Sequence, residues 1–333
     1  LARVLATLFD PSERSRANRA NWDERHWAYW RSIHQVYLVG GLTGALDYAA
    51  VSDCTASAHV TGRGTTGGLI GAIGDSAIIN CNASGNVSGT STAVGGLLGF
   101  MWGLDEDETT GAGDMIIASS ASGNVQGERY VGGLVGYTSR GFFQNCYASG
   151  SAAGNDHVGG LVGFVANNSS YDDVEFFECY ANGDVEAISD YAGGFIGHCK
   201  AEVIKDCYAT GSVRSTGSYV GGLIGRNVYC TIFRSFSTGL VEGIEPVGGL
   251  LTAVYNDTFL CFWDTETSQL DVSSGGMGKS TAEMMSPETY RGWGDDVWVL
   301  DAGNDYPHLA WEGTIGELIT DSKTYIGSGT AED

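Results

Sequence analysis

The amino-acid sequence predicts an all-β protein, a parallel β-solenoid of about eight coils that follows a short basic N-terminal arm. Three observations lead to this prediction. An apolar or small residue followed by two glycines recurs eight times, and a cysteine-centred block follows most of these pairs at a fixed distance. Glycine is abundant while proline is scarce, with 51 and 4 residues in a chain of 333. Glycine without proline, alongside many apolar side chains, is typical of tight turns between ordered strands.

Residues 1–38 form the first predicted element, a basic arm with an aromatic-rich helix over residues 21–35. The arm has a net charge of +2, whereas residues 39–333 have a net charge of −25. We expect it either to cap the open first coil or to reach a second copy, at its acidic surface or its tryptophan-rich C-terminal end, which would propagate a head-to-tail filament. The contact residues would be Arg14, Arg16, Arg19, Trp22, Trp27 and Trp30. Because the chain begins at Leu1, we also expect processing or truncation at this end.

Residues 39–262 form the second element, in which one unit of 27–28 residues occurs eight times. The glycine pairs begin at Gly40, Gly67, Gly95, Gly132, Gly159, Gly193, Gly221 and Gly248. Fourteen residues after most pairs comes the second block, for example NCYASG at 145–150. Its central position is filled by Cys54, Cys81, Ser119, Cys146, Cys179, Cys207, Ser235 and Cys261. Polar insertions lengthen two units, at 101–114 and around 166–173.

Apolar or small side chains keep the same positions around this cysteine from unit to unit. In the first seven units the third residue before it is apolar, the second after it is small, and the sixth after it is almost always valine. Such columns indicate coils that stack so that each short strand pairs in parallel with its equivalent in the next coil, about 4.8 Å away. The unit is too short for a propeller blade of ~40 residues, and the glycine pairs exclude helical repeats.

We interpret the cysteine column as small buried thiols that fill the core. Residues of one column point the same way on neighbouring strands, which disfavours unstrained disulfides. Disulfides and metal binding are the alternatives, although no CxxC or paired-histidine spacing supports zinc. We therefore expect reduced, inward-facing thiols at Cys54, Cys81, Cys146, Cys179 and Cys207.

The amino-acid sequence of the repeats resembles the GLUG repeat over about residues 39–313. VGGLVGY at 131–137, VGGLVGF at 158–164 and VGGLIGR at 220–226 carry the resemblance, each with an NCYASG-like block after it. That repeat occurs in bacterial and archaeal surface proteins, in adhesin-like proteins and in the non-catalytic part of some IgA-specific metallopeptidases. The resemblance implies an extracellular or cell-surface location and supplies no catalytic mechanism.

The end of the chain forms two further predicted elements. Residues 263–313 resemble the segment that closes arrays of this kind, and 314–333 are polar enough for a tail, a linker or an added strand.

An aromatic residue follows the cysteine position in five consecutive units. These residues are Tyr147, Tyr180, Tyr208, Phe236 and Phe262. If the cysteines face inward, alternation along a strand turns the aromatic side chains outward. We expect either an exposed ladder that contacts sugar rings or a partner protein, or a stack that supports the register of the coils.

The acidic insertions supply candidate metal ligands. Asp105 and Asp107 lie in one insertion, and Asp172 and Asp173 lie in the other. Their carboxylates are candidates for Ca²⁺, but their spacing fits neither an EF-hand nor an RTX loop, and solvated charge is the alternative. We expect no other cofactor.

These observations favour a non-catalytic extracellular repeat protein. It would be the subunit of a surface filament or sheath, or an adhesin module that contacts a glycan or a host or cell-surface protein. A net charge of −23 argues against nucleic acid, and no apolar run is long enough for a membrane helix. The alternative is a carbohydrate-active β-helix enzyme, a glycoside hydrolase or polysaccharide lyase. The basic residues and histidines share no column, and HExxH and GxSxG are absent.

Overall fold

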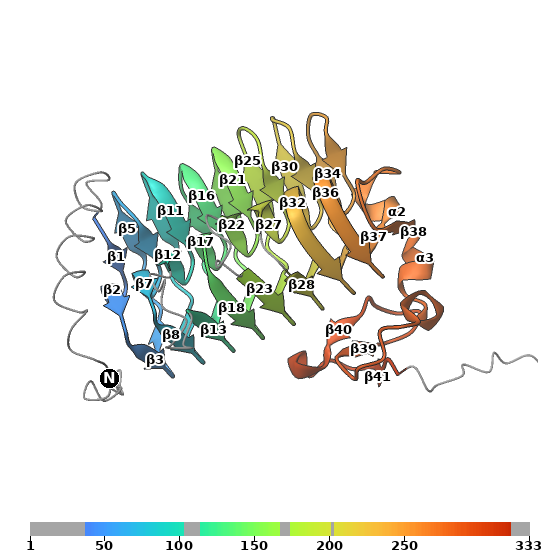
Figure 1. The fold of residues 1–333 in the computed structure, drawn as a ribbon, viewed down its shortest axis with the longest axis horizontal. Helices are drawn as coiled ribbons and strands as arrows, with labels where there is room; N and C mark the ends of the chain where they lie inside the picture. The colour runs from blue at the N-terminus through green and yellow to red at the C-terminus, as the bar shows by residue number, and fades with distance from the viewer. Residues whose placement is uncertain (1–36, 103–113, 167–173, 201–202, 321–333) are drawn as a thin grey trace, which may run out of the picture.

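The structure, a computed structural model, is a β-solenoid of eight coils with a closing segment at its C-terminal end (Figure 1). It describes residues 37–102, 114–166, 174–200 and 203–320. Parallel pairing joins each coil to the next through four sheets, named A to D here, which confirms the predicted fold class. The first glycine of every predicted pair is the last residue of one strand of sheet A, so the coils are numbered one to eight by these pairs.

Sheets A and D form one side of the solenoid. Sheet A consists of β1 (Val39–Gly40), β6 (Thr66–Gly67), β11 (Thr92–Gly95), β16 (Arg129–Gly132), β21 (Asp156–Gly159), β26 (Ala192–Gly193), β31 (Val220–Gly221) and β35 (Val247–Gly248). Sheet D consists of β5 (Val60–Gly62), β10 (Val87–Gly89), β15 (Val125–Gln126), β20 (Ala152–Gly154), β25 (Val185–Ala187), β30 (Val213–Ser215) and β34 (Val241–Glu242). The valines of the two sheets, among them Val131 and Val158, pack into a separate small core.

Sheet B has two runs of strands in coils one to six. The first run is β2 (Thr43–Asp47), β7 (Ile70–Gly74), β12 (Leu98–Trp102), β17 (Val135–Thr138), β22 (Val162–Val165) and β27 (Ile196–Cys199). The second run is β3 (Ala50–Ser52), β8 (Ala77–Ile79), β13 (Met115–Ile117), β18 (Gly141–Gln144), β23 (Val174–Phe177) and β28 (Val203–Lys205). In coils seven and eight both runs merge into single long strands, β32 (Ile224–Phe233) and β36 (Leu251–Phe259).

Sheet C contains the cysteine blocks and gains one strand from the closing segment. Its strands are β4 (Thr55–Ala56), β9 (Asn82–Ala83), β14 (Ser120–Ala121), β19 (Tyr147–Ala148), β24 (Tyr180–Ala181), β29 (Tyr208–Ala209), β33 (Phe236–Ser237), β37 (Phe262–Asp264) and β38 (Met277–Lys279).

The glycine pair brings neighbouring strands too close together for side chains. A Cβ at Gly132 would overlap the carbonyl oxygen of Val135. A Cβ at Gly133 would lie 2.9 Å from the Cβ of Ala148, a member of the column of small residues after the cysteine. The pair and the small column therefore occur together because they face each other across the coil.

The residue before each cysteine position has a left-handed backbone. Its φ lies between 44° and 56° at Asp53, Asn80, Ala118, Asn145, Glu178, Asp206, Arg234 and Leu260. Asparagine and aspartate tolerate this conformation better than most residues, which explains why the column is mostly polar. The turn leads the chain from sheet B into sheet C and lies directly before the inward-facing cysteine position.

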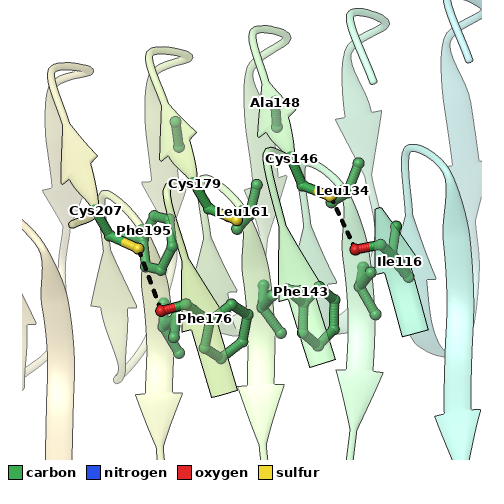
Figure 2. Packing of buried hydrophobic residues seen from close by; sticks show 14 of the residues in the cluster. Ile116, Leu134, Phe143, Cys146, Ala148, Leu161, Phe176, Cys179, Phe195 and Cys207 are labelled. Atoms are coloured by element: carbon green, nitrogen blue, oxygen red, sulfur yellow. Dashed lines mark hydrogen bonds between the residues drawn. The ribbon is translucent and has the colours of Figure 1, made fainter. Parts of the chain in front are cut away.

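The cysteine column faces inward, as predicted. Figure 2 shows Cys146 Sγ donating to the carbonyl of Ile116 in the preceding coil, at 3.2 Å, and Cys207 Sγ donating to that of Phe176, at 3.8 Å. Burial raises the pKa of Cys81 to about 11, so its thiol keeps its proton at neutral pH. Where serine replaces cysteine, its hydroxyl also hydrogen-bonds to the backbone of the preceding coil, because Ser119 Oγ accepts from the N–H of Cys81 at 3.0 Å.

The two cysteines outside the column lie in the core where β27 meets β32. The sulfur atoms of Cys199 and Cys230 are 2.9 Å apart. The side chain of Asn227 holds the backbone of Cys230 through two hydrogen bonds of 3.0 and 3.1 Å.

The closing segment crosses the end of the last coil and then runs along sheet C (Figure 1). It contains α2 (Thr265–Ser268), β38, α3 (Thr281–Met284), the 3₁₀ turns η3 (Pro287–Tyr290) and η4 (Ala310–Glu312), and the strands β39 (Trp298–Leu300), β40 (His308–Leu309) and β41 (Glu317–Leu318). It thus extends past residue 313, and β41 is an added strand in the stretch that follows. These last three strands form the antiparallel sheet E. In the part of the chain that the structure describes, no helix has the length and apolar character needed to cross a membrane.

Candidate functional site

Four of the five residues of the aromatic column predicted from the sequence, Tyr147 to Phe236, form a continuous stack on the outside of sheet C. The ring centroids of Tyr147 and Tyr180 are 5.0 Å apart, as are those of Tyr180 and Tyr208, and those of Tyr208 and Phe236 are 5.1 Å apart. The planes differ by 10° or less, so the ring faces are turned toward one another. The rings in such a stack cover one another's faces, so only their edges and hydroxyl groups remain for other contacts.

Most of this column is covered by the chain itself. Tyr208, Phe236 and Phe262 are only 3%, 0% and 2% exposed. They pack in one cluster with the closing segment, including Trp293 and Trp298. The expectation of an exposed ladder is therefore wrong for these three residues, because a segment outside the repeats occupies their outer side.

Tyr147 and Tyr180 are partly exposed at the edge of the closing segment. Their ring centroids lie 6.2 and 5.7 Å from that of Trp311. They are thus continuous with the covered part of the column.

Polar contacts fasten the closing segment to the left-handed turns beside this column. The Arg234 guanidinium donates two hydrogen bonds to Asp206, at 2.7 and 2.8 Å, and a third to Asp295 of the closing segment. The Trp298 indole donates to the same Asp206 carboxylate at 2.8 Å. Tyr208 of the column donates its hydroxyl to Glu312 at 2.9 Å. The column and the turns before it are therefore the docking surface for the closing segment.

The other residues predicted from the sequence lie outside the described residues. These are Arg14, Arg16, Arg19, Trp22, Trp27 and Trp30 of the arm, and the calcium candidates Asp105, Asp107, Asp172 and Asp173. Within the described ranges, no group of three or more histidine, cysteine or acidic side chains is placed to hold a metal ion.

A second cluster of side chains, which the sequence analysis missed, lies on both sides of the glycine pairs. Phe100, His157 and His198 of this cluster are buried, and its other members are partly exposed. Two residues before the pair, coils four to seven have Tyr130, His157, Tyr191 and Tyr219. Five residues after the first glycine, coils three to seven have Phe100, Tyr137, Phe164, His198 and Arg226. We call these nine residues the aromatic–histidine band. The signal was present in the sequence, because in Y-VGGLVG-Y and H-VGGLVG-F an aromatic residue or histidine stands on each side of the motif.

Backbone geometry brings the two columns of the band together. Tyr130, His157, Tyr191 and Tyr219 have φ values of 52° to 69°. The glycine after the two apolar residues of each motif lets the backbone of the preceding coil come close. A Cβ at Gly163, for example, would lie 2.6 Å from the backbone carbonyl carbon of Tyr130. Each residue before a glycine pair therefore lies beside the second column in the next coil. Tyr130 stacks on Phe164, with ring centroids 5.1 Å apart, and His157 stacks on His198, at 5.4 Å.

Cationic side chains border the band in an otherwise acidic protein. Arg129 lies over the Tyr130 ring at 4.8 Å, and Lys200 Nζ lies 5.8 Å from the centre of Phe164. Arg226, itself in the band, lies over Tyr219 at 5.1 Å and over Tyr191 at 5.8 Å. Contacts between a cation and an aromatic face fix both side chains at the surface.

A hydrogen-bonded chain runs through the middle of the band. Asp156 Oδ1 lies 3.1 Å from Arg129 Nε and 2.8 Å from His157 Nδ1. His157 Nε2 lies 3.4 Å from His198 Nδ1. Burial lowers the pKa of both imidazoles, and the positive charges near His198 help to lower its pKa to about 3. Both rings are therefore neutral at physiological pH.

Comparisons with known proteins support the fold. The GLUG motif model matches residues 36–61, which include coil one. The solenoid is also similar to a crystal structure from Bacteroides ovatus, provisionally described as an immunoglobulin A1 protease. The TM-score is 0.50 at 18% sequence identity, with 78% of this chain and 92% of the other covered. No curated protein matches the sequence. The chain is thus a parallel β-solenoid that carries the GLUG motif in its first coil.

Proposed function

We propose that the protein is a non-catalytic extracellular module of the adhesin type, which binds glycans through the aromatic–histidine band. The observation that carries this proposal is that an aromatic or imidazole side chain stands on each side of the glycine pair in coils four to six. Phe100 continues one column into coil three, and Tyr219 continues the other into coil seven. The other aromatic column already has a partner in the closing segment. The likeness of the repeats to those of surface proteins supports the extracellular location.

The geometry of the band favours an extended, hydroxyl-rich ligand. Phe100 and Tyr137 stack within 4° of parallel, and Tyr191 and Tyr219 stack within 23°. Stacked rings present their edges and tyrosine hydroxyls rather than their faces, and such a surface hydrogen-bonds to polar groups while excluding water. Because the pattern repeats once per coil, it suits a polymer that lies along the solenoid axis.

The same geometry favours binding over hydrolysis. Asp156 is engaged by Arg129 and His157. Among the described residues, no hydroxyl or thiol hydrogen-bonds to the outer nitrogen of His198, so the chain that begins at Asp156 leads to no nucleophile. A glycosidase needs a second carboxylate across the scissile bond, which this arrangement does not supply.

The head-to-tail filament stays a prediction. Contacts of the closing segment oppose the form of it in which a second copy docks at the C-terminal end of the solenoid. The Trp263 ring covers Gly249 of the last coil, and Ser273 Oγ accepts from the N–H of Leu251 at 3.1 Å. These contacts occupy part of the strand edge that a second copy would need.

Affinity electrophoresis through gels containing dextran, mannan, galactan or polygalacturonate tests the proposal. We expect at least one polymer to retard the protein, and we expect the Tyr191→Ala/Tyr219→Ala double variant to lose at least tenfold in affinity. Tyr229→Ala is the matched control, because Tyr229 is exposed and lies outside the band. Retardation by none of the polymers, or equal retardation of the double variant, would contradict the proposal. Release of reducing sugar from a bound polymer would show an enzyme instead.

A further inference from the structure

We propose that His198 and Arg226 form the point at which the band recognises an uncharged sugar with two adjacent hydroxyl groups. The imidazole accepts a hydrogen bond from one hydroxyl, and the guanidinium Nε donates one to the neighbouring oxygen. This inference rests on the proposed function and names the ligand chemistry of the same surface.

The first observation is that two buried polar atoms on adjacent coils have unused hydrogen-bonding capacity. His198 Nε2 and Arg226 Nε are buried, and neither has a hydrogen-bond partner among the described residues. The two residues are register partners in β27 and β32, and the His198 side chain as a whole is only 6% exposed. Buried polar atoms without partners are rare in folded proteins and indicate a missing ligand or water.

The second observation is that both side chains contact the same aromatic ring. The His198 and Tyr191 ring centroids are 5.0 Å apart, and the Arg226 Cζ lies 5.8 Å from the Tyr191 centroid. Tyr219 supports the guanidinium from the next coil, at 5.1 Å. The rings fix both polar groups in place, which lowers the entropy lost when a ligand binds.

The third observation fixes the direction of the hydrogen bonds. A carboxylate only accepts, so Asp156 receives the Nδ1–H of His157. The Nε2 of a neutral His157 then carries a lone pair and accepts from the Nδ1–H of His198. His198 therefore presents a lone pair at Nε2, while Arg226 Nε presents a hydrogen. A pair of neighbouring hydroxyl groups matches this acceptor and donor.

A carboxylate or sulfate does not match the same pair. It would require a proton on His198 Nε2, and the positive charges of Arg226 and Lys200 oppose that proton. The acidic groups that face the two histidines are Asp156 and Asp190. Asp156 already accepts a hydrogen bond from Arg129, and Asp190 accepts one from the N–H of Ser218.

Three variants test the hydroxyl pair against the same four polymers. His198→Phe keeps a ring for stacking and removes the acceptor, and Arg226→Met keeps the stem and removes the donor. We expect each to bind the retarding uncharged polymer roughly tenfold more weakly, as the loss of one hydrogen bond to a partner predicts. Lys205→Met is the matched control, because it removes a cation from β28, outside the band, and it should bind as the unmodified protein does.

Chemical treatment of the polymer gives a second readout. Periodate cleaves the bond between carbons that carry adjacent hydroxyls, so a polymer oxidised with periodate and then reduced with borohydride should no longer bind. Unchanged binding after this treatment, or normal binding by His198→Phe and Arg226→Met, would overturn the inference. The proposed function would still hold if the Tyr191→Ala/Tyr219→Ala variant lost binding. Preferential binding of polygalacturonate, weakened by Lys200→Met, would replace the hydroxyl pair with an anion site.

Discussion

Asp114 shows how the surroundings of a single residue decide its ionisation. The side chain is 1% exposed at the corner of coil three, where the N–H of Ser76 donates to its Oδ1 at 2.8 Å. Burial raises its pKa to about 8; Asp75 adds to this rise, and the Ser76 hydrogen bond and Arg140 oppose it. The carboxyl is therefore protonated in the folded state at a pH where the unfolded chain has lost the proton. Stability falls as the pH rises from about 4 to about 8, because the folded state binds more protons over that range.

We expect Asp114→Asn to be more stable than the unmodified protein at pH 8 and similar to it at pH 4. The amide keeps the shape of the protonated acid and cannot ionise. The pKa rises from 3.8 to about 8, and one pKa unit corresponds to about 1.4 kcal/mol, so the gain at pH 8 should be up to about 5 kcal/mol in the free energy of unfolding. Chemical denaturation at both pH values measures it, with Glu186→Gln as the control for an exposed carboxylate. The same pH dependence in Asp114→Asn and in the unmodified protein would show that Asp114 ionises normally.

At the scale of the coil, the sequence predicts the positions that every repeat fills in the same way. The glycine pair, the small residue and the cysteine each meet the same neighbours in each coil, so their identities recur. The burial of the aromatic column was not predictable in this way, because Trp293 and Trp298, which cover it, come from a segment outside the repeats. The aromatic–histidine band could have been predicted, since alternation along the strands on each side of VGGLVG turns the flanking residues outward.

The small column gives the prediction for a single coil. Ala209 is fully buried, and its Cβ lies 3.0 Å from the place where a side chain at Gly194 would begin. Ala209→Trp should therefore overpack the interior and destabilise the protein by about 1–3 kcal/mol or more. Arg214→Trp is the control on the next strand along the chain, because that side chain is half exposed. Equal melting temperatures for the two variants would contradict the inward position of Ala209.

At the scale of the whole molecule, the composition of sheet C follows the extent of the closing segment. Coils one to three have Thr55, Asn82 and Ser120 in the column that is aromatic from coil four onward. Ser120 donates to Asn82 at 2.7 Å, so this part of the column satisfies its polar groups without a cover. The aromatic part is the part that lies in or next to the cluster with the closing segment. The segment is therefore an integral layer of the fold, and the repeats that it covers have aromatic residues where it packs.

Trp298 is the residue that we expect to hold this layer in place. It is fully buried, contacts Tyr208 and Phe236, and donates to Asp206, which also binds Arg234. Trp298→Ala should remove about 3–5 kcal/mol from the stability of the closing segment. Because the coils are joined to one another by their own ladders, the loss should stay local. Hydrogen exchange should speed up in residues 286–320 and in β29 and β33, while sheet A of coils two to four stays protected. Equal acceleration throughout the solenoid would show instead that the closing segment and the coils unfold as one cooperative unit.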